Sequence, residues 1–217
     1  MKLNIDAYRY PDFRRYTLAG LVMLHGSWIL RLSIAWLAWD FSGQASVVGW
    51  IAFLTYAPTM ISGPFFGALV DRTRILRAAF IVQSLLAGLS LVLFALSVTG
   101  LLTLPLLAVL ALSIGIGTSA YHPVRLSLGP LLAPPEAVSS VVTASSINFN
   151  IARSIGPAIG GWLIAAYGSG AALLVCFLCT LPFLSVLPFL RPRPRPNGRR
   201  EGESLRQSLA EGLRGAW

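Results

Sequence analysis

The sequence predicts an all-α membrane protein with six transmembrane helices. Its 217 residues are 55% hydrophobic and only 12% charged, whereas soluble domains carry about 25% charged residues. The charged residues are also unevenly spread, because most of them lie in short segments between long apolar runs. A chain with so little polar surface is better solvated by lipid, and about 20 consecutive apolar residues suffice for a helix to cross the hydrocarbon layer.

Six apolar runs reach this length and define a predicted transmembrane bundle over residues 1–190. The runs cover residues 16–40, 47–70, 78–98, 101–121, 138–166 and 170–190. Turn formers or charged residues separate them, namely Ser42-Gly43-Gln44, Asp71-Arg72-Thr73-Arg74, Thr99-Gly100, Pro134-Pro135-Glu136 and Gly168-Ser169-Gly170. The first run is too long for a signal peptide and five more follow it, so we expect no cleavage there.

The basic residues predict that both termini lie in the cytoplasm, because Lys and Arg gather in cytoplasmic loops. Of the 17 basic residues, 15 lie in the two tails and in the second and fourth loops, where Arg125 is placed. The first, third and fifth loops contain none. We therefore expect a multi-pass protein of the inner (plasma) membrane, with only Arg31 and Arg153 inside its spans.

Residues 191–217 predict a basic cytoplasmic linker. The alternating prolines and arginines after residue 190 prevent both a continued helix and insertion into the membrane. Further on, Leu205, Leu209 and Leu213 recur at every fourth position, which is typical of the start of an amphipathic helix. Such a tail predicts a connection to something further along the chain.

Spans two and five share a G-P-x-x-G motif, at Gly63–Gly67 and at Gly156–Gly160. The two spans cross the membrane in opposite directions, and each is second in a group of three. An inverted repeat of three plus three helices leaves this pattern. Glycines four residues apart let another helix approach closely, so the motif serves either helices that rock against each other or static packing.

The loop after span two resembles that of the major facilitator superfamily, which reads G-x-x-x-D-R-x-G-R-R. Gly67, Asp71 and Arg72 match in place, whereas Arg74 stands where the family has its second glycine. The resemblance implies that this loop, with Arg77, latches a cytoplasmic gate through an Asp–Arg interaction that breaks and re-forms between states. Alternatively, these charges only set the topology.

The sequence Gly156-Pro157-x-x-Gly160-Gly161 is similar to the core of the antiporter motif found in exporters of this superfamily. Further similarity to its enterobactin-exporter-like branch, which covers multidrug and siderophore efflux, lies in Asn148–Pro157, in Gly26-Ser27-Trp28 with Arg31, and in His122–Arg125. The resemblance covers nearly the whole chain and implies the N-terminal six-helix half of a transporter. Span four lacks the arginine that many proton antiporters of the superfamily carry.

Arg31 and Arg153 are the strongest candidates for handling cargo. An arginine near the middle of the membrane costs about 2.5–3.5 kcal/mol and therefore usually faces a cavity or a partner. No Asp or Glu lies in the middle of a span, so two buried cations would suit an anionic substrate. Alternatively, the arginines bond to neighbouring carbonyls or polar groups. Ser146 and Asn150 share a face with Arg153, and with Thr59 of span two they predict a water-filled substrate cavity.

His25 is the one histidine deep in a span, and it is either a proton relay or a hydrogen-bonded packing residue. Cys176 and Cys179 have no further Cys or His pair with which to form a zinc site, so no metal is expected. The sequence contains no phosphate-binding loop, nucleophile elbow or carboxylate pair, which argues against an enzyme and a cofactor. It has no basic stripe with interleaved aromatics, which argues against nucleic-acid binding.

These observations favour a secondary active exporter of small molecules that works by alternating access, with anionic cargo as the specific hypothesis. The expected partners are the lipid bilayer, the small-molecule substrate and a second six-helix half, on the same chain or on another one, without which activity is not expected. The alternative is a polytopic membrane scaffold or assembly partner that transports nothing.

Overall fold

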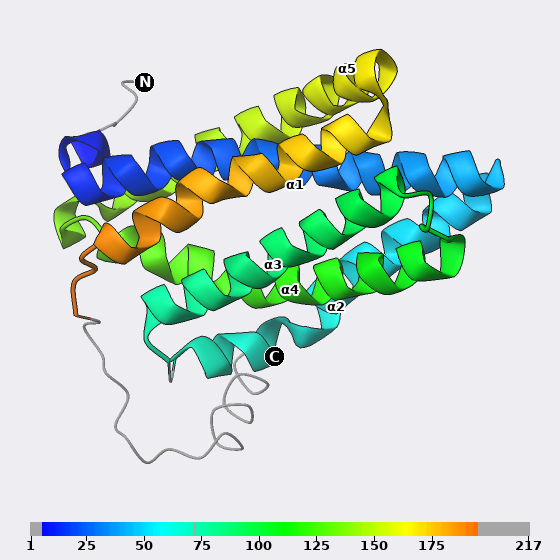
Figure 1. The fold of residues 1–217 in the computed structure, drawn as a ribbon. Coiled ribbons are helices and arrows are strands. Elements are labelled where there is room, and N and C mark those ends of the chain that lie inside the picture. Colours follow the sequence, from blue (N-terminus) through cyan, green and yellow to red (C-terminus); the bar gives the residue numbers. More distant parts are fainter. Residues whose placement is uncertain (1–5, 72, 195–217) are drawn as a thin grey trace.

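The computed structural model describes residues 6–71 and 73–194, and their side chains except those of residues 61–65 and 67–71. Within these residues the chain forms helices and turns and no strand (Figure 1). The long helices are α1 (Pro11–Ser42), α2 (Ala45–Asp71), α3 (Ile75–Val98), α4 (Leu104–Leu131) and α5 (Val138–Val186). Three short 3-10 turns accompany them, namely η1 (Asp6–Arg9), η2 (Pro135–Ala137) and η3 (Leu187–Phe189).

Four stretches of helix in the described part of the chain are long and apolar enough to cross a membrane. They are α1, α3, α4 and a 55-residue stretch, Pro135–Phe189, that contains α5, whereas the apolar part of α2, Ala45–Met60, is shorter. The 55-residue stretch exceeds twice the length of one span. It reverses direction at Gly168, whose φ of 85° and ψ of 168° interrupt the helix.

Glycine adopts a positive φ without a steric penalty, which explains why the reversal occurs at this residue. Figure 1 shows α5 leaving one end of the bundle and returning to it after the reversal. We call residues 138–167 the first arm of α5 and residues 169–186 the second arm. The two arms correspond to the predicted spans 138–166 and 170–190.

Two helices extend well beyond the predicted apolar runs. The fourth run was expected to end at residue 121, but α4 continues to Leu131 and contains both Pro123 and Pro130. The prediction that Arg125 lies in a loop is therefore wrong, because this residue belongs to α4. Likewise α1 begins at Pro11 rather than at residue 16. Hydropathy detects only the apolar part of a helix, and the polar ends continue the same backbone hydrogen bonding.

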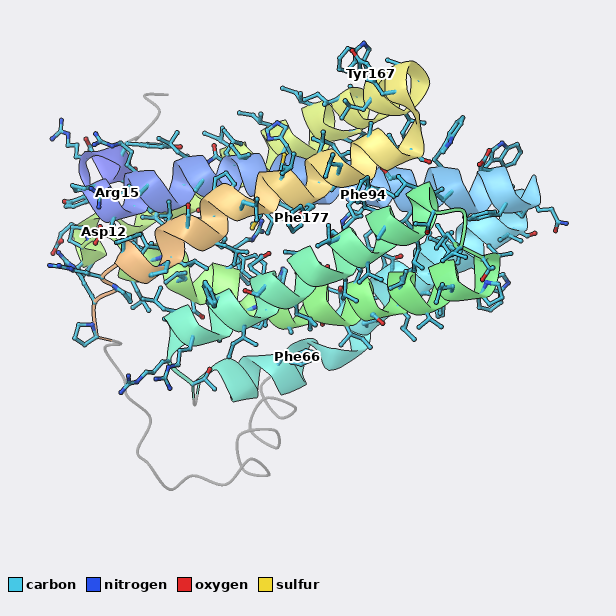
Figure 2. The ribbon with its side chains drawn as sticks, viewed as in Figure 1. Asp12, Arg15, Phe66, Phe94, Tyr167 and Phe177 are labelled. Carbon is cyan, nitrogen blue, oxygen red and sulfur yellow. The ribbon has the colours of Figure 1, made fainter. Side chains whose placement is uncertain are left out.

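The described residues begin and end at the same end of the bundle, which we call the terminal end. The Ala7 amide donates to Ser140 Oγ over 3.0 Å, and the Arg193 amide donates to the Leu131 carbonyl over 2.9 Å. The Arg191 amide also donates to the Asp12 carboxylate, at 3.3 Å. Figure 2 shows Asp12 at this end and Tyr167 at the opposite end, next to the reversal of α5.

Small residues set the closest approaches between helices. A Cβ added to Gly156 in the first arm would lie 2.7 Å from Trp28 Cβ in α1, and one added to Gly115 in α4 would lie 2.6 Å from the Thr55 carbonyl oxygen in α2. These distances are too short for any side chain, so the helix backbones approach closely at both points. The most extensive contacts of the bundle accordingly join α1 to α5 and α4 to α2.

Candidate functional site

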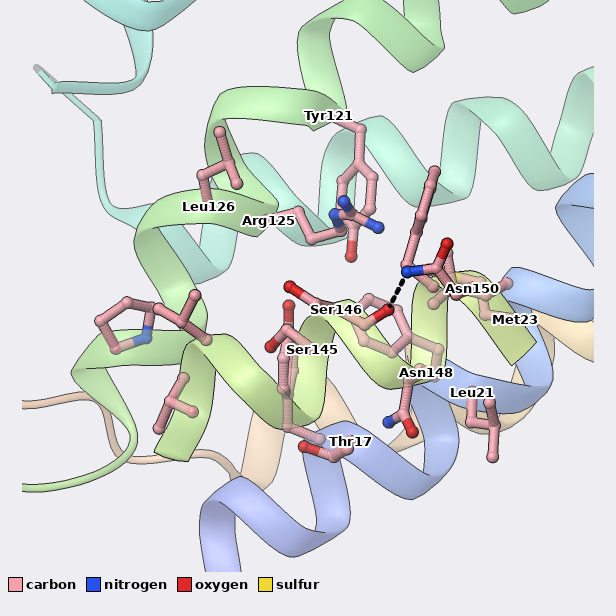
Figure 3. Close-up of a pocket in the computed structure, with 18 residues that line it drawn as sticks. Thr17, Leu21, Met23, Tyr121, Arg125, Leu126, Ser145, Ser146, Asn148 and Asn150 are labelled. Carbon is pink, nitrogen blue, oxygen red and sulfur yellow. Dashed lines mark hydrogen bonds between the residues drawn. The ribbon is translucent and has the colours of Figure 1, made fainter. Parts of the chain in front are cut away.

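A cavity of about 220 Å³ lies between α1, α4 and the first arm of α5, and Phe183 of the second arm completes its wall (Figure 3). Its polar lining comes from Thr17, Tyr16, Tyr121, Arg125, Ser145, Ser146, Asn148 and Asn150. Aromatic and aliphatic side chains, among them Phe149 and Met23, form the rest of the wall. Small-molecule sites likewise combine apolar walls with converging polar groups, although this cavity is smaller than their usual range of about 300–1,000 Å³.

Arg125 supplies the positive charge of this cavity. Because α4 continues through Pro123, Tyr121 and Arg125 are four residues apart on one helical face, and Figure 3 shows their side chains next to each other. The guanidinium carbon of Arg125 lies 4.7 Å from the centre of the Phe149 ring. Such a cation–π contact stabilises a desolvated arginine by up to about 2 kcal/mol.

Arg31 and Arg153 meet at a single tryptophan. The guanidinium carbons of Arg31 and Arg153 lie 5.5 and 6.0 Å from the centre of the Trp28 ring. Arg31 also lies 4.7 Å from the Tyr56 ring of α2, and Trp28 contacts Phe149 edge to face at 5.8 Å between ring centres. Contacts between aromatic rings and guanidinium groups therefore form an unbroken series that runs from α2 through α1 and the first arm of α5 to α4.

We call this group the arginine–aromatic row. It consists of Tyr56, Arg31, Trp28, Arg153, Phe149 and Arg125. Within the described part of the chain, carboxylates form ion pairs only with arginines outside the row, at the start of the chain. The row thus brings together three positive charges with aromatic faces and no carboxylate partner among the described residues.

Arg31 contains a polar atom that no described residue satisfies. Its Nη1 is buried and has no hydrogen-bond partner there. Arg31 lines a second cavity of about 60 Å³, together with Gln83, Thr118 and Thr180. This cavity is large enough for about two water molecules. An unsatisfied buried nitrogen on a charged group is costly, so this position favours a ligand or solvent that accepts a hydrogen bond.

The remaining predicted cavity residues occupy different places. Ser146 and Asn150 line the larger cavity, and Asn150 Nδ2 donates to the Ser146 carbonyl over 2.8 Å. Arg153 is exposed on the surface of the first arm and lines neither cavity. Thr59 is half-buried and also lines neither. Arg153 therefore joins the site through Trp28, whereas Thr59 is not among the residues that line the two cavities.

Outside the gate, the other predicted residues lie within α1 and the first arm of α5. His25 Nδ1 lies 2.8 Å from the Leu21 carbonyl oxygen of its own helix, and its relay role stays a prediction. Gly156 and Gly160 abut α1, whereas Gly161 has only one loose neighbour. Pro157 belongs to the same helix and is half-buried.

The predicted gate falls partly outside the described residues. Arg72 lies there entirely, as do the side chain of Asp71 and the whole predicted amphipathic segment after residue 194, whereas only the helical backbone of Gly67 is described. Arg77 is described and lies exposed in the first turn of α3. The latch between Asp71 and Arg72 therefore stays a prediction.

Sequence reasoning missed Arg125, Tyr121 and Phe149 as site residues. Arg125 was assigned to a loop because the fourth run was ended too early, at the first polar residues. The spacing of Tyr121 and Arg125 was the available signal, since four residues place two side chains on one face of a continuous helix.

Comparison with known proteins identifies the family. The sequence profile of the family described as "Transmembrane secretion effector" matches residues 5–216, which is nearly the whole chain. The chain belongs to this family. The family is part of the major facilitator superfamily, so the resemblance predicted from the loop after α2 and from the first arm of α5 is confirmed. It is a family of transporters rather than of enzymes.

The sequence identity between this chain and its individual relatives is low. It is 26% identical to the staphyloferrin A transporter of Staphylococcus aureus over 176 residues, which cover 78% of the chain and 42% of the relative. It is also 26% identical to the multidrug efflux pump Tap of Mycolicibacterium fortuitum over 216 residues, or 92% of the chain and 50% of the pump. The chain thus spans about half the length of these relatives. No solved structure matches it significantly.

Proposed function

We propose that this chain is one six-helix half of an exporter that moves small anionic molecules across the cell membrane by alternating access. The observation that carries the proposal is the arginine–aromatic row, which gathers Arg31, Arg125 and Arg153 without a described carboxylate partner. Family membership supports transport. The relatives are named for carrying staphyloferrin A and for multidrug efflux, which supports a small-molecule cargo and outward movement.

The packing of small residues supports an inverted repeat of three plus three helices. In such a repeat α1 would correspond to α4, α2 to the first arm of α5, and α3 to the second arm. Gly156 of the first arm abuts α1, and the corresponding pair of helices, α2 and α4, comes equally close at Gly115, although this glycine lies on α4 rather than on α2. Gly26 of α1 abuts Cys179 of the second arm, and correspondingly Gly117 of α4 abuts Leu86 of α3. Each close contact therefore has a counterpart under this exchange.

One such half leaves its polar face open. Ser146, Asn150 and Arg153 are all exposed on the first arm, although a strip of this polarity is costly against lipid. Two repeats that rock against each other around a central site are the usual architecture of secondary transporters. We infer that a second half, on the same chain or on another one, covers this strip and completes the pathway.

The distribution of charge supports an orientation with the terminal end in the cytoplasm. Seven described arginines lie at or near that end, namely Arg9, Arg14, Arg15, Arg74, Arg77, Arg191 and Arg193. The turns at the opposite end, around Gly43, Gly100 and Gly168, contain no Lys or Arg. Cytoplasmic loops collect positive charge, so the gate predicted between Asp71, Arg72 and Arg77 would lie on the inner side.

A binding experiment tests the preference for anions. The full chain would be reconstituted in discs of neutral phosphatidylcholine, and fluorescence anisotropy would report binding of the anionic dye carboxyfluorescein, an uncharged boron-dipyrromethene dye and the cationic dye rhodamine 6G. We expect at least tenfold tighter binding of the anionic dye, and roughly tenfold weaker binding of that dye by Arg31→Gln or Arg153→Gln, because a hydrogen bond to a charged group is worth about 1.5–3 kcal/mol.

Arg14→Gln is the matched control, because it removes an exposed charge of the terminal end that lies outside the row. Helix content by circular dichroism would show that each variant is folded. Unchanged binding of the anionic dye by both row variants would refute the proposed cargo class. Efflux from proteoliposomes under an imposed pH gradient is expected only when a second six-helix half is reconstituted with the chain.

A further inference from the structure

A second, wider depression lies at the terminal end, away from the arginine–aromatic row. It is a groove of about 930 Å³ between the start of α3 and the segment that leaves η3. It shares no lining residue with either cavity of the row. Its volume lies in the upper part of the range for small-molecule sites, about 300–1,000 Å³, so it can hold a ligand of considerable size.

Three arginines surround this groove. Arg74 and Arg77 come from the start of α3, and Arg193 comes from the extended segment after η3. All three are exposed, and among the side chains that the structure describes no carboxylate pairs with them. The Arg193 amide is bonded to the Leu131 carbonyl, which fixes the segment that carries its side chain against the end of α4.

The start of α3 adds further positive character to the groove. Arg74 occupies the N-cap position of this 24-residue helix, and its side chain makes no capping hydrogen bond to the amides of the first turn. Free amides at a helix N-terminus carry a partial positive charge that favours anions. The three arginines and the helix end therefore attract the same kind of group.

Apart from Thr73, the other side chains that line the groove are apolar, and the groove opens toward the outside of the bundle. Phe80 and Ile81 line it on α3 with 44% and 65% of their surface exposed, and Pro188 lines it on the other side. A free phosphate would use the arginines but would leave these apolar surfaces uncovered. An amphiphile with an anionic head and hydrocarbon chains complements both parts.

We propose that this groove binds the headgroup of an anionic phospholipid of the leaflet at the terminal end. The arginines hold the phosphate groups, and the acyl chains lie along Phe80 and Ile81 down the outer face of α3. Basic pockets between transmembrane helices recognise anionic headgroups in this way. The occupant differs from the cargo of the row in both location and chemistry, so the site does not depend on the proposed export function.

Native mass spectrometry of the full chain tests the site. The protein would be titrated in neutral detergent with phosphatidylglycerol or with phosphatidylcholine carrying identical acyl chains. Each arginine near a membrane surface contributes roughly fivefold to the binding of anionic lipid. We expect the variant with Arg74→Gln, Arg77→Gln and Arg193→Gln to lose roughly a hundredfold in affinity for phosphatidylglycerol and little for phosphatidylcholine.

The matched control removes the same charge from the same end of the bundle, through Arg9→Gln, Arg14→Gln and Arg15→Gln. These residues are exposed and lie outside the groove. We expect this variant to keep its affinity for phosphatidylglycerol within about threefold, because the salt of the buffer screens exposed charges that lie outside the binding site. An equal loss in both triple variants would overturn the proposal in favour of diffuse attraction.

Two further measurements keep the test decisive. The single variant Arg77→Gln leaves the other contacts of the groove in place, and we expect about a fivefold loss from it even if the triple variant aggregates. Inorganic phosphate at millimolar concentration is expected not to displace the bound lipid. Full displacement by phosphate, or binding of phosphatidylglycerol and phosphatidylcholine with equal affinity, would contradict a phospholipid site.

Discussion

Replacing Gly156 with alanine probes the contact that brings Arg153 to Trp28. The new Cβ would lie 2.7 Å from Trp28 Cβ, about 0.7 Å short of the 3.4 Å at which ordinary contact begins, and 3.3 Å from the His25 carbonyl oxygen. Neither atom is the end of a flexible side chain, so α1 and α5 must move apart. Overpacking of this kind costs roughly 1–3 kcal/mol, whereas alanine in place of glycine in a helix gains about 1 kcal/mol.

Gly161→Ala separates these two effects. Gly161 lies in the same helix, and its added Cβ would meet only a Leu32 methyl carbon at 3.9 Å. It therefore has the gain in helix propensity without the clash. We expect Gly156→Ala to be about 1–3 kcal/mol less stable than Gly161→Ala, measured by circular dichroism as sodium dodecyl sulfate is titrated into mixed micelles. Equal transitions in the two variants would refute the close approach of α1 and α5.

Two more substitutions test the packing elsewhere. Gly115→Ala would place its Cβ 2.6 Å from a carbonyl oxygen of α2, so the same titration should show a loss of stability of roughly 1–3 kcal/mol. Gly88→Ala is the control, because its added Cβ meets nothing within 4 Å. Equal unfolding midpoints of the two variants would contradict the contact between α4 and α2. Ser140→Ala removes the acceptor of the buried Ala7 amide, at a cost of about 1–3 kcal/mol. Ser140→Ala should therefore speed proteolytic cleavage near Ala7, whereas the control Ser139→Ala, at an exposed position, should not. Equal cleavage rates in the two variants would show that this hydrogen bond does not hold the start of the chain in place.

The helices were largely predictable because each apolar run is long and ends at a turn former. Gly168 shows this clearly, since the break predicted from Gly168-Ser169-Gly170 lies where the backbone leaves the helical region. The end of α4 was not predictable from hydropathy, which measures transfer into lipid rather than the tendency to stay helical. Pro123 and Pro130 are tolerated inside α4 because neighbouring helices can satisfy or shield the carbonyls that a proline frees.

The candidate site was predictable only in part. Arg31 and Arg153 were identifiable because a charge inside an apolar run is costly wherever its side chain points. Their meeting at Trp28 depends on the crossing of α1 and the first arm of α5, which Gly156 and the residues opposite it determine. Arg125 was missed because its identification requires the correct end of α4. Spacing along the chain gives the faces of single helices but not the way in which those faces cross.

The three arginines of the row also constrain what a completing half can contribute. A cation–π contact returns about 0.5–2 kcal/mol, which is less than the roughly 2.5–3.5 kcal/mol that an arginine costs near the middle of the membrane, where Arg31 and Arg153 are predicted to lie, so an anion should still bind favourably. A carboxylate on the second half would satisfy this need permanently. However, separating a buried ion pair costs about 3–5 kcal/mol, and such a pair would oppose the rocking that alternating access requires. Under the proposed function, a mobile anionic cargo would satisfy the arginines in one state and leave them to solvent in the other, so we expect a completed transporter to keep the preference for anions.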